Sequence, residues 1–305
     1  MNIFQRNAAA NLAEKRQQKR DSAQKKFDIL TKDAAYSSTR AELFDAVLAA
    51  RAPSDIEKIN KKLSQRVAKL GFSNEELQER NYCKKCQDSG TLFSDGKAVQ
   101  CGCVKTAIAE AAYGASMTPD TAENSFRGFI TEQLISERPE LDLTYRMLSS
   151  FVEMLDGKGR TPLNYFTVMG ATGTGKTLAV SVFFNKLKAE GVFSYFISAA
   201  TLAQTFSRSV STYNAAEIAD IMSELTSPEV LIVDDLGAET FFDNVTRPKM
   251  QEIIEARKEK LTVITTNLSP KQLETRYGER FISRVFDTKK GGKVRLSGAD
   301  FRLER

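Results

Sequence analysis

The segment GATGTGKT, from Gly170 to Thr177, limits what this chain can fold into more than any other part of its sequence. It matches G-x-x-x-x-G-K-[ST] at every fixed position, after an apolar strand-like run at 165–169 and before a helix-compatible run at 178–187. Its glycines let the backbone turn N–H groups toward phosphate with no Cβ in the way, and the following helix adds the positive end of its dipole. The pattern therefore predicts a P-loop that connects a strand to a helix and binds nucleotide phosphates.

Every position of this loop is expected to contact the nucleotide. Lys176 would reach the β- and γ-phosphates, and the hydroxyl of Thr177 would bind Mg²⁺. The predicted nucleotide-binding residues of the loop are Gly170, Ala171, Thr172, Gly173, Thr174, Gly175, Lys176 and Thr177.

Two later apolar runs, VLIVDD at 230–235 and TVITTN at 262–267, end in polar side chains. In a doubly wound sheet, the ligand binds at the carboxyl ends of the strands, which is where these polar side chains would lie. Asp234 is expected to hold Mg²⁺ together with Thr177, and Asp235 either polarises the attacking water or is a plain turn residue. Glu239 is a weaker candidate than Asp235 for polarising the attacking water. Asn267 would orient that water, although Asn-Leu-Ser-Pro is also an ordinary way to start a helix.

The alternation of strand-like and helix-like segments from residue 161 onward predicts an α/β fold, a parallel sheet flanked by helices. Residues 36–80 look helical, with Leu43, Phe44, Val47 and Leu48 on one face and a helix start at Ser54. Those apolar stripes form an intramolecular core or a partner-binding face. We predict a helical region at 1–80, a cysteine module at 81–105, a linker region at 106–160 and the nucleotide-binding domain at 161–305.

The polar, basic stretch 1–35 is expected to be a solvated arm or a basic interaction arm. A net charge of +5 permits contact with nucleic acid, and the absence of histidine excludes histidine ligands and histidine acid/base chemistry. The sequence has no long apolar run and no secretory segment at its start, so we expect no transmembrane helix and a cytoplasmic location.

All four cysteines, Cys83, Cys86, Cys101 and Cys103, fall within one short segment. A disulfide framework would spread them more widely. Four thiolates with no open position predict a structural, tetrahedral Zn²⁺ site. An iron–sulfur cluster and a redox dithiol are the alternatives.

The segment YGERFISRVF places Arg280 and Arg284 four residues apart on one helix face. They are surface charges or an arginine finger, for which a planar and permanently charged guanidinium is suited.

Several of these motifs together resemble one family. CKKCQDSG, CGC, SMTPDTAENSF, GATGTGKT, VLIVDDLGAE, TTNLSPKQLETRYGERFISRVF and the closing GADFRL are similar to the DnaC/DnaI replicative-helicase loaders, which are AAA+ proteins. The ATPase IstB, a transposition helper, has a similar core. The resemblance covers roughly residues 80–305, and the GER-x-x-x-R helix with the ADFRL ending is its most specific part.

The resemblance implies a slow, DNA-responsive ATPase that uses ATP, Mg²⁺ and Zn²⁺. It implies self-association through the ATP sites, with Arg284 as an arginine finger acting on a neighbouring copy, Arg280 as its companion, and Arg302 in contact with nucleotide or neighbour. The implied partners are a hexameric replicative helicase and single-stranded DNA. Positive charge concentrates near the C-terminus, and the residues that carry it either contact single-stranded DNA or form a solvated basic face: Lys271, Arg276, Lys289, Lys290, Lys293 and Arg295. A transposition helper and a non-replicative AAA+ regulator are the alternatives.

Overall fold

The computed structural model describes residues 3–73, 81–94, 96–116, 139–155, 161–212, 214–298 and 300. The chain forms two compact units. The core unit comprises Met1–Asn7 and Ile108–Arg305, and the N-terminal unit comprises Ala8–Ala107. No helix among the described residues is both long and apolar enough to cross a membrane.

The N-terminal unit is built mainly from helices: α1 (Ile3–Lys32), which begins in the core unit, α2 (Ala34–Leu48) and α3 (Pro53–Lys69). The stretch expected to be a solvated arm is therefore a helix of 30 residues. Side chains four apart support it, because the amides of Gln17 and Gln24 donate to Asp21 and Asp28. Helix α3 starts at Pro53 rather than after Ser54, because proline suits the first helical position.

A small apolar cluster of Leu30, Tyr36 and Val67 joins these three helices. Asp33 caps α2 by accepting from the N–H of Tyr36 at 2.8 Å, and it also pairs with Arg66 of α3. The stripe predicted on α2 lies largely outside this cluster, since Phe44, Val47 and Leu48 are 64%, 56% and 70% exposed. The stripe was expected to form either an intramolecular core or a partner-binding face. These three exposed side chains are not part of a core among the described residues.

A short antiparallel hairpin, β1 (Thr91–Ser94) and β2 (Lys97–Gln100), separates the two cysteine pairs. It is followed by α5 (Gly102–Ala115), which runs from the N-terminal unit into the core unit. The hairpin was not predicted from the sequence.

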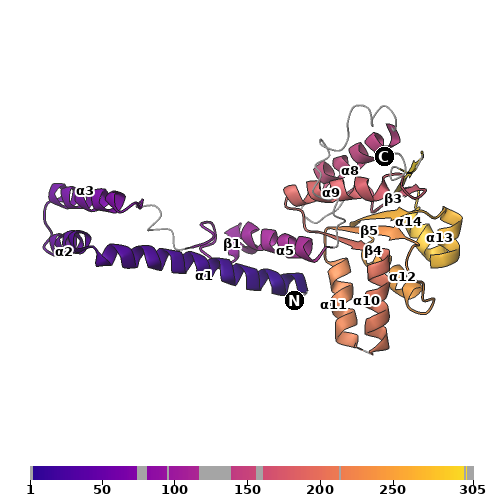
Figure 1. The fold of residues 1–305 in the computed structure, drawn as a ribbon, viewed down its shortest axis with the longest axis horizontal. Helices are drawn as coiled ribbons and strands as arrows, with labels where there is room; N and C mark the ends of the chain where they lie inside the picture. Colours follow the sequence, from indigo (N-terminus) through magenta and orange to yellow (C-terminus); the bar gives the residue numbers. More distant parts are fainter. Residues whose placement is uncertain are drawn as a thin grey trace. The chain divides into compact units, whose positions relative to one another are not determined.

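The core unit has the predicted α/β fold: a parallel five-stranded sheet with helices on both faces (Figure 1). In chain order its elements are α8 (Pro139–Met154), β3 (Tyr165–Gly170), α9 (Lys176–Ala189), β4 (Ser194–Ser198), α10 (Ala199–Ser211), α11 (Ala215–Thr226), β5 (Val230–Leu236), α12 (Thr246–Ala256), β6 (Leu261–Thr266), α13 (Pro270–Tyr277), α14 (Glu279–Val285) and β7 (Gly291–Leu296). Helices α8 and α9 lie over one face of the sheet, and α10, α11 and α12 lie over the other.

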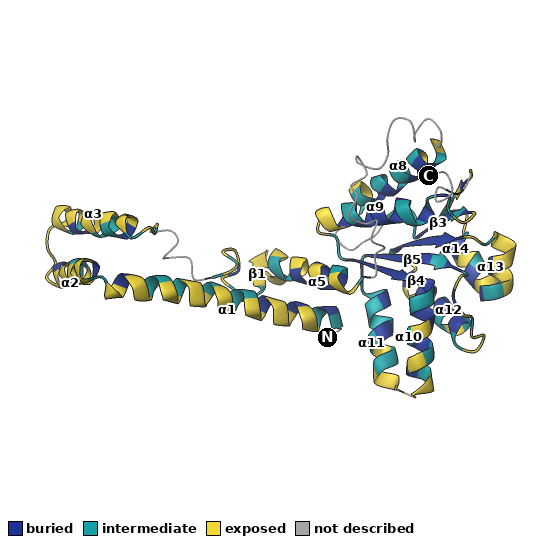
Figure 2. Ribbon diagram, in the orientation of Figure 1, coloured by how far each residue is buried: buried dark blue, intermediate teal, exposed yellow. Residues whose placement is uncertain are grey.

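The strand order β4-β5-β6-β3-β7 brings the predicted motifs together. Strand β6 lies between β5, which ends in the two aspartates, and β3, which leads into the P-loop. Because the strands are parallel, their polar ends meet at one edge of the sheet. Strands β3, β4, β5 and β6 are buried on both sides (Figure 2), which explains their apolar runs.

Candidate nucleotide and metal sites

The P-loop connects β3 to α9 as its sequence predicts. Gly175 precedes α9 with a φ of 91°, a left-handed conformation that favours glycine. A Cβ on Gly170 would lie 2.6 Å from the carbonyl oxygen of Leu296, so that position also requires glycine. Lys176 is buried, and its Nζ donates to the carbonyl oxygens of Gly170 and Ala171 at 3.0 and 2.7 Å. The lysine is thus already folded over the loop that it is predicted to serve.

Asp234 lies beside Thr177, as the predicted Mg²⁺ site requires. The Oγ1 atom of Thr177 is 3.0 and 3.2 Å from the two carboxylate oxygens of Asp234. Burial raises the pKa of Asp234, while hydrogen bonds from Thr265 and Thr177 act in the opposite direction. A carboxylate that shares a hydroxyl at the mouth of a P-loop fits Mg²⁺, an ion that prefers oxygen ligands. Asp234 and Thr177 would hold the ion, which would offset the negative charge of the nucleotide phosphates.

Asp235 and Asn267, both predicted to act on water, lie against each other. The Nδ2 atom of Asn267 donates to Oδ1 of Asp235 at 3.0 Å. Asp235 has a φ of 55°, and the pairing of β5 with β6 shifts register between Val233 and Leu236. This local bulge separates the two aspartates, so that one carboxylate faces Thr177 and the other faces Asn267.

Glu239 has a different environment from these residues. Its carboxylate is buried, pairs with Arg276 at 3.0 Å and accepts from the N–H of Gly237 at 2.8 Å. Arg276 also lies 4.6 Å from the ring centroid of Phe241. Glu239 and Arg276 thus form an ion pair with each other, and the water contact considered for Glu239 and the DNA contact considered for Arg276 stay predictions.

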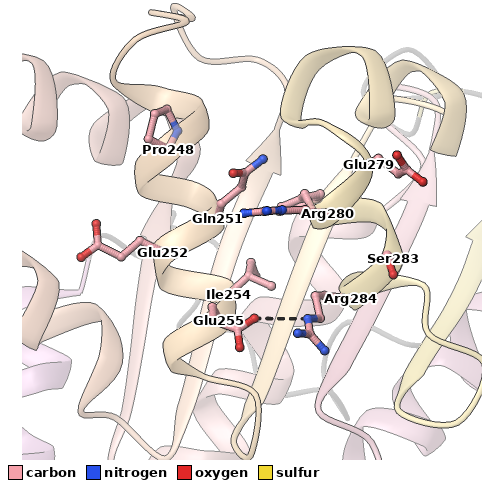
Figure 3. Close-up of a pocket in the computed structure, with 10 residues that line it drawn as sticks. Pro248, Gln251, Glu252, Ile254, Glu255, Glu279, Arg280, Ser283 and Arg284 are labelled. Carbon is pink, nitrogen blue, oxygen red and sulfur yellow. Dashed lines mark ion pairs between the residues drawn. The ribbon is translucent and has the colours of Figure 1, made fainter.

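Arg280 and Arg284 line one groove of about 780 Å³ between α12 and α14 (Figure 3). The Nε atom of Arg284 is 3.2 Å from Glu255 on the facing helix, and the figure draws Arg280 beside Gln251. None of the residues that line this groove belongs to the P-loop, to the Asp234–Asp235 pair or to Asn267.

The predicted nucleotide contact Arg302 lies outside the described residues. Asp300, two positions earlier, is described: a Cβ added to Gly173 would overlap its carboxylate, so the chain reaches the P-loop at that point.

The four cysteines of the N-terminal unit converge. Their Sγ atoms all lie within 4.8 Å of one another, with 3.8 Å between Cys83 and Cys101 and 3.6 Å between Cys86 and Cys103. A tetrahedral Zn²⁺ with Zn–S bonds of about 2.3 Å requires sulfur–sulfur distances of about 3.8 Å. The four residues therefore fit zinc.

Backbone groups support Cys83 and Cys86 as thiolates. The N–H of Gly90 points to Cys86 Sγ at 3.4 Å, and hydrogen bonds from the backbone of Cys86 and Lys85 help lower the pKa of Cys83 to about 7. Burial raises the pKa of Cys103. Asp88 fixes the first knuckle by accepting from the N–H of Cys83 at 2.9 Å.

Four residues that contact the predicted ones were not themselves predicted from the sequence. Thr265 contacts the two aspartates, Asp88 and Gly90 contact the cysteine cluster, and Glu255 pairs with Arg284. Thr265 stands two positions before Asn267 at the end of the β6 run, and that shared strand edge is the one signal that could have identified it.

The chain was compared with known proteins. Residues 162–303 match the family described as IstB-like ATP binding protein. A comparison with curated protein sequences found no significant match.

Among solved structures, the chain is similar to AMPPCP-bound DnaA from Aquifex aeolicus, with a TM-score of 0.44, 21% identity, and coverage of 57% of this chain and 49% of that one. It thus spans about half the length of that protein. It is also similar to the DnaC helicase loader (TM-score 0.41, 22% identity, 50% of this chain and 87% of that one) and to DnaI (TM-score 0.43, 19% identity, 60% and 93%).

The family match spans the P-loop, the two aspartates, Asn267 and both arginines of α14. It confirms the ATP-binding core that the motifs predicted. Residues 162–303 of this chain, which carry the P-loop and the two aspartates, are similar to the IstB-like ATP-binding family.

Proposed function

We propose that this chain is an ATP-dependent loader, which binds a hexameric replicative DNA helicase and delivers it onto single-stranded DNA. ATP favours side-by-side assembly of copies, and slow hydrolysis to ADP and phosphate releases them. The ATP-binding core supports the first half of this proposal. The specific GER-x-x-x-R and ADFRL motifs, with the cysteine module, support the second half.

One observation carries the assembly step. Arg280 and Arg284 line a groove that contains none of the phosphate-binding residues of the same chain. Arg284 pairs with a half-exposed carboxylate, Glu255, and such a surface ion pair is weak, so the arginine can exchange this partner for a stronger one at low cost. The γ-phosphate of a nucleotide bound to a neighbouring copy is such a partner. The ATP bound to one chain and the arginines of a second chain would then form one complete site at their interface.

A second surface supports a protein partner for the N-terminal unit. Phe44, Val47 and Leu48 are all exposed, and their spacing of three and four residues places them on one face of α2. Exposed apolar groups in such a cluster are typical of interaction sites. We assign this face of α2 to the helicase, and we assign the DNA to the core unit.

The basic residues near the end of the core support contact with DNA. Lys289 and Lys290 lie in the turn before β7, and Lys293 and Arg295 alternate along β7 itself. All four are exposed, as is Lys271 on α13. Contacts of lysine and arginine with phosphate release counterions, so binding to single strands should weaken steeply as salt is added.

Co-purification with the resident replicative helicase tests this function. We expect wild-type protein to retain the helicase with ATP and to release it with ADP. The double variant Phe44→Ser/Leu48→Ser should lose the helicase and keep its ATP affinity. Leu143→Ser is the matched control, since Leu143 is 53% exposed on α8 of the core unit. Equal retention by all three proteins would contradict the assignment of α2, and no retention by wild type would contradict helicase loading.

A transposition helper is the second candidate, and the description of the matched family favours it. Such a protein would bind duplex DNA and a transposase. Preference for duplex over single-stranded DNA at equal salt, together with capture of a transposase instead of a helicase, would select this candidate.

A further inference from the structure

Thr265, on β6, contacts both aspartates at the end of β5. Its side chain is completely buried. The Oγ1 atom donates to Oδ1 of Asp234 at 2.6 Å and accepts from the backbone N–H of Asp235 at 2.8 Å. A threonine hydroxyl has one proton, so the bond from the Asp235 N–H leaves that proton for Asp234.

The contact with Asp235 replaces a missing sheet bond. At the register shift between Val233 and Leu236, the N–H of Asp235 has left the regular ladder. A buried N–H without a partner would be costly, and the threonine oxygen supplies the acceptor. It thereby holds Asp235 in its left-handed conformation, in which the carboxylate accepts from Asn267.

The contact with Asp234 reaches the predicted Mg²⁺ site. Asp234 also receives Thr177, so one set of hydrogen bonds runs from Thr177 through Asp234 and Thr265 to Asp235 and Asn267. We propose that Thr265 is a positioning residue for ATP hydrolysis, whose hydroxyl fixes the metal-site aspartate and the water-activating aspartate in one arrangement. This inference rests on the proposed ATPase activity and adds a residue to the same site.

A purely structural threonine is the competing explanation, since β-branched residues favour strands. The other threonines of β6 illustrate that role. The hydroxyl of Thr262 accepts from Arg257 at 2.9 Å, and that of Thr266 donates to the carbonyl of Leu236 at 2.6 Å. Thr265 differs from them because its partners are the two site aspartates.

The neighbouring strand offers a matched control. Thr167 on β3 is also completely buried, and within the described part of the chain its hydroxyl has no hydrogen-bond partner. Replacing either threonine by valine removes a buried hydroxyl and keeps the branched shape. The two substitutions differ in whether that hydroxyl contacts Asp234 and Asp235.

The test compares Thr265→Val, Thr265→Ser and Thr167→Val in ATP hydrolysis and in binding of a fluorescent, non-hydrolysable ATP analogue. We expect Thr265→Val to slow hydrolysis roughly 10- to 100-fold, because a buried pair of hydrogen bonds is lost. Its analogue affinity in EDTA should stay within about twofold of wild type, and the Mg²⁺ concentration needed for tight binding should rise several-fold. Thr265→Ser should approach wild type, and Thr167→Val should match it.

Equal loss in Thr265→Val and Thr265→Ser, wild-type behaviour of Thr265→Val, or equal loss in Thr167→Val would each overturn the inference. If thermal unfolding shows that Thr265→Val is not folded, Thr265→Ala is compared with Thr265→Ser, since these two differ only in the hydroxyl. If wild type binds the analogue without hydrolysing ATP, the proposed activity fails. The Mg²⁺ dependence of binding still decides the role of Thr265.

Discussion

At the scale of single residues, the site depends on an unusual backbone conformation at Asp235. A φ of 55° is uncommon outside glycine, although aspartate tolerates it better than most residues. Such a conformation costs on the order of 1 kcal/mol or more and persists only where neighbours enforce it. Thr265 accepts from the backbone N–H of Asp235, and Asn267 donates to its carboxylate. These two hydrogen bonds together stabilise the unusual conformation.

Asp235→Asn should therefore separate nucleotide binding from hydrolysis. The amide keeps the shape of the side chain and the backbone conformation, but it cannot take a proton from water. We expect hydrolysis to fall about 10²-fold or more, with ATP affinity nearly unchanged. Asp243→Asn, at an exposed position, is the control. Wild-type turnover in Asp235→Asn would assign the water to another residue.

A second carboxylate, Glu224 on α11, is expected to make stability depend on pH. Burial, and then the charge of Asp220, raises its pKa from 4.5 to about 7, while Arg6 acts in the opposite direction. Asp220 and Arg6 are themselves paired at 2.7 Å, and Tyr195 lies close enough to feel the charge of Glu224. A raised pKa in the folded state means that this group favours folding most below pH 4.5, and that the benefit is lost as the pH rises through 7.

Glu224→Gln should remove that dependence. At pH 8 we expect the melting temperature to exceed that of wild type by about 2–4 °C, because about 1 kcal/mol remains after solvent screening. At pH 5 the difference should be close to zero. Glu190→Gln, at an exposed position, should leave both values unchanged. A difference that is the same at pH 5 and pH 8 would contradict the pKa assignment.

At the scale of elements, the sequence predicted most of the sheet and less of its surroundings. Strands β3, β4, β5 and β6 are buried, so their apolar runs identify them. Strand β7 was not predicted, because this edge strand is only partly buried and reads GGKVRL, with two apolar residues in six.

Helix α1 was missed for a similar reason. Its buried apolar contact in the core unit is made by Phe4, with ring centroids 5.9 Å from Phe193 and 5.1 Å from Tyr195. A lone aromatic residue in a polar stretch has no periodicity that could reveal this role. The site residues at strand ends were predictable because motif and strand coincide. The bulge at Asp235 was not, since it depends on contacts between β5 and β6.

The cysteine module is expected to need its metal in order to fold. Purified protein should contain about one Zn²⁺ per chain, and Cys83→Ser should release it, because among the described residues the cluster consists of the four cysteines alone. Since a structural zinc contributes roughly 10–16 kcal/mol to such modules, residues around 80–105 should lose their protection from hydrogen exchange. Ser94→Ala, in the hairpin between the two cysteine pairs, is the control. Protein without stoichiometric metal that is nevertheless protected at 80–105 would contradict the zinc assignment.

At the scale of the whole molecule, each of the two units carries a distinct group of predicted contacts. The N-terminal unit carries the cysteine site and the exposed face of α2, and the core unit carries the nucleotide site and the arginine groove. Within the core unit, the P-loop and the groove share no residue. The proposed function therefore requires a second copy: ATP bound to one chain would be hydrolysed only when the arginines of another chain reach it.

Mixing two inactive variants tests this dependence most directly. Lys176→Ala should lose nucleotide binding, and Arg284→Ala should bind ATP nearly normally while its hydrolysis falls on the order of 10³-fold. The first protein still offers the arginines and the second still offers an ATP site. Arg208→Ala, at an exposed arginine of α10, should remain active. The account predicts that the mixture recovers a clear fraction of wild-type ATP hydrolysis. A mixture that assembles and yet stays as inactive as each variant alone would contradict it.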